Sequence, residues 1–225
     1  MFSVLFEVHP RLDQGDAYLG YAKLLRPELQ RVEGFIDNIR YGSKRREGWV
    51  LSLSTWRDEK ALVRWRTHAV HHSIQEKGRR DIFQDYHLRV AQVLADSHVP
   101  EGQALRDPRP DETEGGESKV VTLVAAAWPG TLHENASVET IAARLGFRAD
   151  ARGLIAWDLF EALLTPGDLL LLLSWRDSLS ADAGEATAAR PETGRRRRLK
   201  VVRDYGMFER YEAPQYYPEI PRGKR

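Results

Sequence analysis

Residues 54–74 read STWRDEKALVRWRTHAVHHSI, and part of this stretch returns as SWRD at residues 174–177. The two WRD triplets are 119 positions apart (175 − 56 = 119), and other identical residues keep the same offset without gaps. The matching pairs are Gly34 with Gly153, Gly48 with Gly167, Trp56 with Trp175, Arg57 with Arg176, Asp58 with Asp177, Asp85 with Asp204 and Tyr86 with Tyr205. Identities that share one offset predict a duplicated structural unit.

Hydrophobic periodicity predicts the same order of elements around each WRD triplet. In the first copy, alternating apolar residues predict four strands, at 3–10, 35–43, 48–56 and 79–94. Helical spacing predicts two helices, at 14–32 and 59–75. The resulting order, strand-helix-strand-strand-helix-strand, is that of a ferredoxin-like unit.

The second copy repeats this order with weaker signals, because Ala and Gly replace the Trp and His residues after its WRD triplet. The segment between the copies is polar, rich in Pro and Gly and without periodicity, which is typical of a linker. We therefore expect four parts, namely unit one at 1–95, a linker at 96–118, unit two at 119–211 and an extended tail at 212–225.

Two strands of the second copy, VVTLVAAAW (120–128) and LLLLLSW (169–175), hardly alternate between apolar and polar residues. A ferredoxin-like sheet with helices on one side should show polar residues on its open face. Burial on both faces predicts that a second sheet, from the other unit or from another chain, packs there. The expected fold class is α+β, with two tandem ferredoxin-like units.

Composition narrows the classes of partner and site. The formal net charge is +1, so no global attraction to nucleic acid is expected, and the run Arg195 to Arg198 is interpreted as a solvated strand start. The chain has no cysteine, which excludes disulfides and thiolate sites. No apolar run approaches the roughly 20 residues of a membrane helix. We expect a cytoplasmic protein that binds neither nucleic acid nor a membrane.

A family resemblance rests on the residues that follow the first WRD triplet. The pattern WRDEKALVRW, the histidines after it and GRRDIFQDYHLRV (78–90) resemble the antibiotic-biosynthesis monooxygenase family. The resemblance covers residues 3–94 well and 119–212 weakly. It implies small ferredoxin-like modules that pair sheet to sheet as a dimeric α/β barrel, so this chain would carry a fused pair. Further pairing into a homodimer would be permitted by the tail and the edge strands.

The helix predicted at 59–75 carries the candidate catalytic residues. At 100° per residue Trp65 and His72 fall on one face, with His68 beside them. One interpretation is simple packing of this face on the sheet. The other is a ligand pocket in which Trp65 forms a wall and His68 or His72 transfers a proton, since histidine titrates near neutrality.

No metal site is expected. The HAVHH segment lacks the Glu that marks a zinc hydrolase helix, and a third ligand would have to come from Glu7, His9 or His87.

The resemblance implies two branches of chemistry. One oxidises phenolic or quinol-like compounds with no metal or flavin, because an electron-rich anion can itself reduce oxygen. Its substrate pocket would use Asn38, Trp56 and Tyr86 beside the residues of the helix. Trp56 and Tyr86 recur in the second copy and have a structural interpretation too, whereas Trp65 and the histidines occur in unit one alone.

The other branch degrades heme, and its expected Asn in the first strand is missing here. We therefore expect a cofactor-independent monooxygenase of a small aromatic or polyketide-like compound. A heme-binding monooxygenase and a non-catalytic ligand-binding barrel are the alternatives.

Overall fold

The computed structural model describes residues 1–128, 136–188 and 194–220. Unit one contains strands β1 (Phe2–Pro10), β2 (Phe35–Ser43), β3 (Val50–Trp56) and β4 (Phe83–Asp96). Its helices are α1 (Gly15–Arg31), α2 (Glu59–Arg66), α3 (Ala69–Lys77) and the π-helical turn η1 (Gly78–Ile82). Unit two contains β5 (Val120–Ala127), α4 (Val138–Arg144), β6 (Leu154–Ala162), β7 (Asp168–Trp175), α5 (Ser178–Thr187) and β8 (Arg195–Gly206). The α+β class and the ferredoxin-like order of strands are confirmed.

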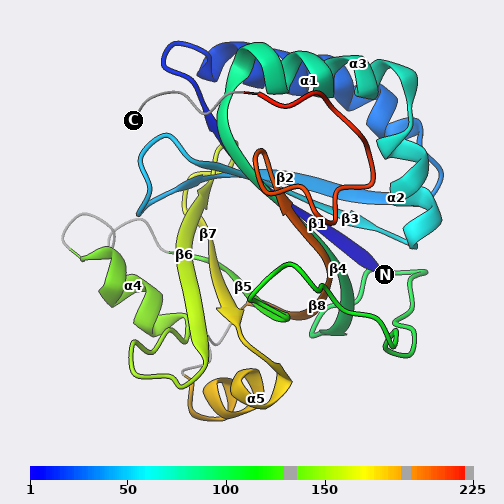
Figure 1. Cartoon of the computed structure of the whole chain (residues 1–225). Helices are drawn as coiled ribbons and strands as arrows, with labels where there is room; N and C mark the ends of the chain where they lie inside the picture. The colour runs from blue at the N-terminus through cyan, green and yellow to red at the C-terminus, as the bar shows by residue number, and fades with distance from the viewer. Residues whose placement is uncertain (129–135, 189–193, 221–225) are drawn as a thin grey trace.

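The eight strands form one closed barrel in the order β1-β3-β2-β6-β7-β5-β8-β4, and every neighbouring pair is antiparallel. Two seams join the units: a long one between β4 and β8, and a short one in which Tyr41 to Ser43 of β2 pair with β6. The helices lie outside the barrel, with α1 to α3 over unit one and α4 and α5 over unit two (Figure 1). No helix among the described residues is long and apolar enough to span a bilayer.

The two WRD triplets form equivalent strand-to-helix junctions. Asp58 accepts a hydrogen bond from the Ala61 N–H at the start of α2, and Asp177 accepts one from Ser180 at the start of α5. An Asp at the N-cap satisfies an N–H that the first helical turn leaves unpaired. This shared geometry agrees with the equivalent positions in the fold that the 119-residue offset predicts for the two triplets.

The single helix predicted at 59–75 is wrong, because the chain forms two helices with a break between them. The Thr67 hydroxyl donates to the Val63 carbonyl, and His68 is extended (φ −63°, ψ 127°). The turn folds α3 back so that the His71 ring stacks on Trp65, with 4.2 Å between ring centroids. The strand predicted from residue 79 begins at Phe83, because residues 78–82 form η1.

The solvated interpretation of the run Arg195 to Arg198 is also wrong. Arg197 is buried and its guanidinium donates to the Thr55 hydroxyl at 3.1 Å. Arg195 makes two bonds to Asp96, and Arg198 pairs with Glu185. The run does start β8, as predicted. Alternation with Leu199 and Val201 turns Arg197 into the barrel interior, whereas Arg195, Arg196 and Arg198 are partly exposed.

The interior of the barrel is apolar through most of its length. Fifteen buried residues from all eight strands form this core, among them Leu5, Leu53, Leu123, Phe160 and Leu199. Side chains alternate between the interior and the outer faces along each strand. At one end of the barrel the alternation places polar residues inward instead, and there the core opens into a cavity.

Candidate functional site

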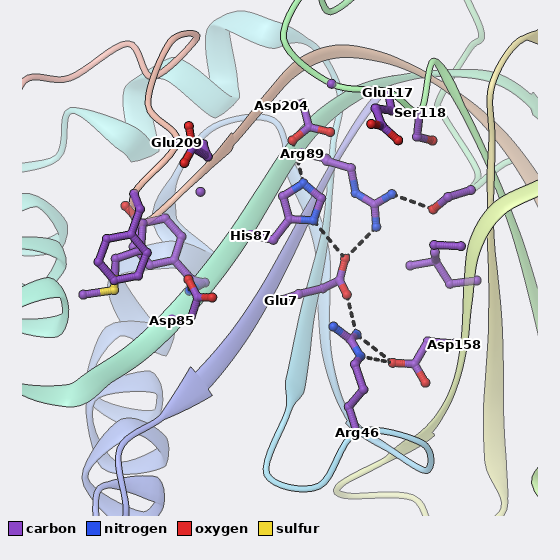
Figure 2. Close-up of a pocket in the computed structure, with 18 of the residues that line it drawn as sticks. Glu7, Arg46, Asp85, His87, Arg89, Glu117, Ser118, Asp158, Asp204 and Glu209 are labelled. Carbon is purple, nitrogen blue, oxygen red and sulfur yellow. Dashed lines mark hydrogen bonds and ion pairs between the residues drawn. The ribbon is translucent and has the colours of Figure 1, made fainter. Parts of the chain in front are cut away.

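The cavity at the end of the barrel has a volume of about 1210 Å³ and is lined by both units. Six ionisable residues on its wall interact with one another (Figure 2), namely Glu7, Arg46, His87, Arg89, Asp158 and Asp204. Apolar side chains complete the wall, among them Phe83, Leu172, Met207 and Ile220. A concave volume with a few converging polar groups and apolar walls is typical of a small-molecule site.

Strand periodicity explains why these charges face inward. Glu7 stands two residues after Leu5 on β1, and Arg89 stands two residues before Ala91 on β4, so each shares the inward face of a core residue. Asp158 precedes Phe160 on β6 in the same way. Strands therefore position Glu7, Arg89 and Asp158, whereas Arg46 comes from the turn between β2 and β3.

The Glu7 carboxylate is the centre of the cluster. One of its oxygens accepts from Arg89 at 2.6 Å and the other from Arg46 at 2.5 Å. Burial raises the pKa of Glu7, but the attraction of Arg89 and Arg46 outweighs burial and places this pKa below its ordinary value. Glu7 is therefore an ionised anchor that orients two guanidinium groups towards the cavity.

Arg46 links Glu7 to a second buried carboxyl group. Its Nε donates to Asp158 at 2.8 Å, and the Ser43 hydroxyl donates to the same carboxyl at 2.9 Å. Burial raises the pKa of Asp158 above its ordinary value, although Arg46 and Ser43 act against this. Two carboxyl groups on one guanidinium thus have pKa values shifted in opposite directions.

His87 completes the polar wall and joins the two units. Its Nε2 lies 2.5 Å from Asp204 of β8, and its Nδ1 lies 3.8 Å from Glu7 of β1. A carboxylate that holds one imidazole nitrogen orients the ring and leaves the other nitrogen for proton transfer. His87 is partly exposed to the cavity, so a bound molecule can reach it.

Arg89 is buried, yet its hydrogen bonding is incomplete. Its two terminal nitrogens donate to Ser174 at 2.8 Å and to Glu7. Its Nε is buried without an acceptor among the residues that the structure describes. A buried N–H without a partner is costly, so a cavity-lining guanidinium with a spare donor is suited to an oxyanion of a bound molecule.

The structure places the predicted catalytic residues outside this cavity, on the helical side of unit one. Trp65 is buried in the layer between the helices and the sheet and stacks with His71 and His68. His68 also lines a smaller surface depression of about 270 Å³ beside Glu28. His72 is exposed and contacts Tyr217 of the C-terminal tail.

The predicted substrate-binding residues are dispersed. Trp56 is fully buried against the helices, and its indole N–H donates to Ser54. The Asn38 side chain donates to Ser52 and to the Leu53 carbonyl. Tyr86 alone lines the barrel cavity, with a hydroxyl that accepts from Arg79.

Sequence reasoning missed Arg46, Arg89 and Asp158, and it considered Glu7 and His87 only as metal ligands. A signal was present, because a charged residue at an inward position of a two-faced apolar strand must be paired or functional. No group of three or more His, Cys, Asp or Glu residues in the described ranges is arranged to hold a metal ion.

Comparisons with known proteins agree with this architecture. A family model described as antibiotic biosynthesis monooxygenase matches residues 1–77. The chain is 47% identical over 223 residues to a protein of Pyricularia oryzae named jasmonate monooxygenase ABM. The aligned region covers 97% of this chain and 99% of that protein.

Among solved structures, one match has a TM-score above 0.5 and indicates a similar fold. A crystal structure of aldoxime dehydratase in complex with butyraldoxime matches with a TM-score of 0.56 and 11% identity, over 90% of this chain and 79% of the other. An anthrone oxidase-like protein matches with a TM-score of 0.35 and 13% identity, over 95% and 96% of the two chains.

Proposed function

Because the chain belongs to the antibiotic biosynthesis monooxygenase family, we propose that it is a monooxygenase whose reaction takes place in the cavity at the end of the barrel. The observation that carries this proposal is the position of His87, held by Asp204 and open to a cavity whose wall also contains Arg89. A base and an oxyanion donor in one apolar-walled volume are what an oxygenase acting through a substrate anion requires.

The proposed substrate is a small organic acid or phenol with an enolisable or ionisable group. The relative named for jasmonate supports this class, since jasmonate is a cyclopentanone carboxylic acid. The apolar wall formed by Phe83, Leu172 and Met207 would hold the carbon skeleton, and the arginines would face its oxygen atoms. A small aromatic ketone satisfies the same requirements.

The proposed reaction uses no cofactor. His87 removes a proton from an activated CH₂ group, and Arg89 stabilises the resulting enolate. The enolate carbon reduces O₂ and forms a C–O bond, and the resulting peroxide takes the proton back from His87 to give the hydroperoxide R₂CH–OOH. His87 then removes the remaining hydrogen of that carbon as a proton, the C=O bond forms as the O–O bond breaks, and the departing hydroxide takes this proton and leaves as water. The balance is R₂CH₂ + O₂ → R₂C=O + H₂O, in which the substrate supplies all four electrons.

Oxygen uptake and product mass test the proposal. The purified protein is incubated with jasmonic acid and with a small aromatic ketone, each with and without an added reductant. We expect oxygen consumption equal to product formed without the reductant. His87→Ala should lower the rate by roughly 10²- to 10⁴-fold, the usual contribution of a general base.

The matched control is His98→Ala, because His98 is exposed and bonds only to its neighbour Ser97 and to Asp96 in the described structure. Equal rates for the two variants would refute the assignment of the site. A requirement for the reductant would refute the cofactor-free balance. A change in the absorbance of added heme, together with turnover that depends on heme, would favour the heme alternative.

A further inference from the structure

A second cluster of cations lies on the opposite face of β4 from His87. Arg66 ends α2, Arg79 lies in η1, and Arg210 follows β8. Arg79 and Arg210 meet at the hydroxyl of Tyr86, beneath residues 210–220, which we call the C-terminal strap. The Arg66 backbone carbonyl accepts from the Gln215 side chain of this strap. The strap runs beside α1 to α3 of unit one (Figure 1).

Two guanidinium groups share the Tyr86 hydroxyl. Arg79 donates to it at 2.6 Å and to the Met207 carbonyl at 3.1 Å. Arg210 donates to the same hydroxyl at 2.8 Å and to the Gln215 carbonyl at 2.8 Å. Because the Tyr86 oxygen accepts from both arginines, its own hydrogen is left to donate elsewhere.

The cluster has spare donors and no paired carboxylate. Arg79 is 4% exposed, and its second terminal nitrogen finds no acceptor among the described residues. The Nε of Arg66 is also buried without an acceptor in those ranges. None of Arg66, Arg79 and Arg210 forms an ion pair in the described part of the chain, unlike Arg80, which is paired with Asp81.

Neutral groups offset part of this charge. The Tyr217 ring lies 5.3 Å from the Arg79 guanidinium and 5.4 Å from that of Arg210, within cation–π range. Glu76 is close enough to raise the pKa of Tyr217, but it is exposed and does not pair with the arginines. A buried cation that contacts only neutral groups is costly, because those contacts do not compensate for the hydration that the cation loses.

We propose that Arg79 and Arg210 form a second binding site, which takes a small oxyanion beneath the C-terminal strap. The flat fork of a guanidinium matches the oxygens of a carboxylate or a phosphate, and the Tyr86 hydrogen adds a donor of the kind that such oxygens accept. The side chains of Tyr86 and His87 point to opposite faces of β4, so the two arginines lie across this strand from His87, although Tyr86 and Met207 also line the barrel cavity. Its ligand is either a free phosphate or a carboxylic acid, and both present the same chemistry.

Calorimetric titration of the whole protein at fixed ionic strength tests the proposal, with inorganic phosphate and with acetate as separate probes. We expect saturable binding of at least one probe, weakened about 10- to 100-fold by Arg210→Gln, since each charge-assisted hydrogen bond contributes about 1.5–3 kcal/mol. The matched control is Arg80→Gln, which removes an exposed, paired arginine of the same turn and should bind as the wild type does.

Side-chain NMR keeps the test independent of whether a variant folds. In the unaltered protein, the Nε–H signal of Arg79 should move on addition of the probe that binds, while that of Arg80 stays in place. Phosphate binding without acetate binding identifies a phosphate site, and the reverse identifies a carboxylate site. The proposal is overturned if neither probe saturates, or if Arg210→Gln binds as tightly as Arg80→Gln.

Discussion

Replacement of Glu7 by Gln should be the most destabilising single change in the polar end of the barrel. Glu7 and Arg89 are both nearly inaccessible, and their contact is 2.6 Å long. Without the carboxylate, Arg89 would retain only the Ser174 hydroxyl as a partner. The change should cost Arg46 less, because its side chain is about one-third exposed to solvent and it also pairs with Asp158.

The expected loss of stability follows from the position of Arg89, which is more deeply buried than Arg46 and has fewer other partners. Loss of one partner of a buried ion pair costs about 3–5 kcal/mol, because the other charge stays buried and unpaired. A loss of about 4 kcal/mol should lower Tm by roughly 8–16 °C in a chain of this size. The matched control is Glu33→Gln, whose side chain is 71% exposed and pairs with Arg57, and it should change stability by less than about 1 kcal/mol.

The double variant Glu7→Gln with Arg89→Met distinguishes a lost charge pair from general damage. It removes both buried charges, so we expect it to recover at least half of the lost stability. Urea unfolding at pH 7 measures all four proteins. Our reasoning would be refuted by a Glu7→Gln cost below about 1 kcal/mol, or by a double variant less stable than the single one.

The pH dependence gives an independent measurement of the same pair. The pKa of Glu7 is lowered on folding from about 4.5, so the unfolded chain binds more protons than the folded one in that range. The stability that Glu7 contributes is therefore present above about pH 4.5 and is lost as the pH falls through its folded pKa. The difference between wild type and Glu7→Gln should shrink over the same fall in pH.

Three further outcomes are expected. Asp204→Asn should lower the rate of the proposed reaction by about 10- to 100-fold and shift its pH profile, because Asp204 is the group that orients His87. An unchanged pH profile would contradict the role of Asp204 in orienting His87. Burial lowers the pKa of His71 to about 4, so its NMR titration should have a midpoint far below 6.5, and the stability linked to it should be lost as the pH falls from about 6.5 towards 4. Gly184→Ala should cost about 1–3 kcal/mol in thermal unfolding, because the added methyl would lie 2.2 Å from the Trp175 ring, whereas Gly20→Ala enters open space in a helix and should be neutral or stabilising.

The sequence by itself predicted the class and order of the elements. The N-cap aspartates and the switch between helical and strand periods are local properties, so they can be read from the chain. Strands that are apolar on both faces predicted a second packed layer against β5 and β7, and the family resemblance implied that this layer belongs to a barrel. The sequence did not predict the break at Thr67. The break accompanies the stacking of the His71 ring on Trp65, a side-chain contact that helical periodicity does not reveal.

Only the tertiary structure decided where the charges meet. Strand alternation places Glu7, His87 and Asp158 on inward faces, but it does not tell which strands become neighbours when the barrel closes. The seam between β4 and β8 brings His87 to Asp204, and the seam between β2 and β6 brings the Arg46 turn to Asp158. These partners are more than a hundred residues apart in the chain, so the cavity and its chemistry exist only after the two units have joined.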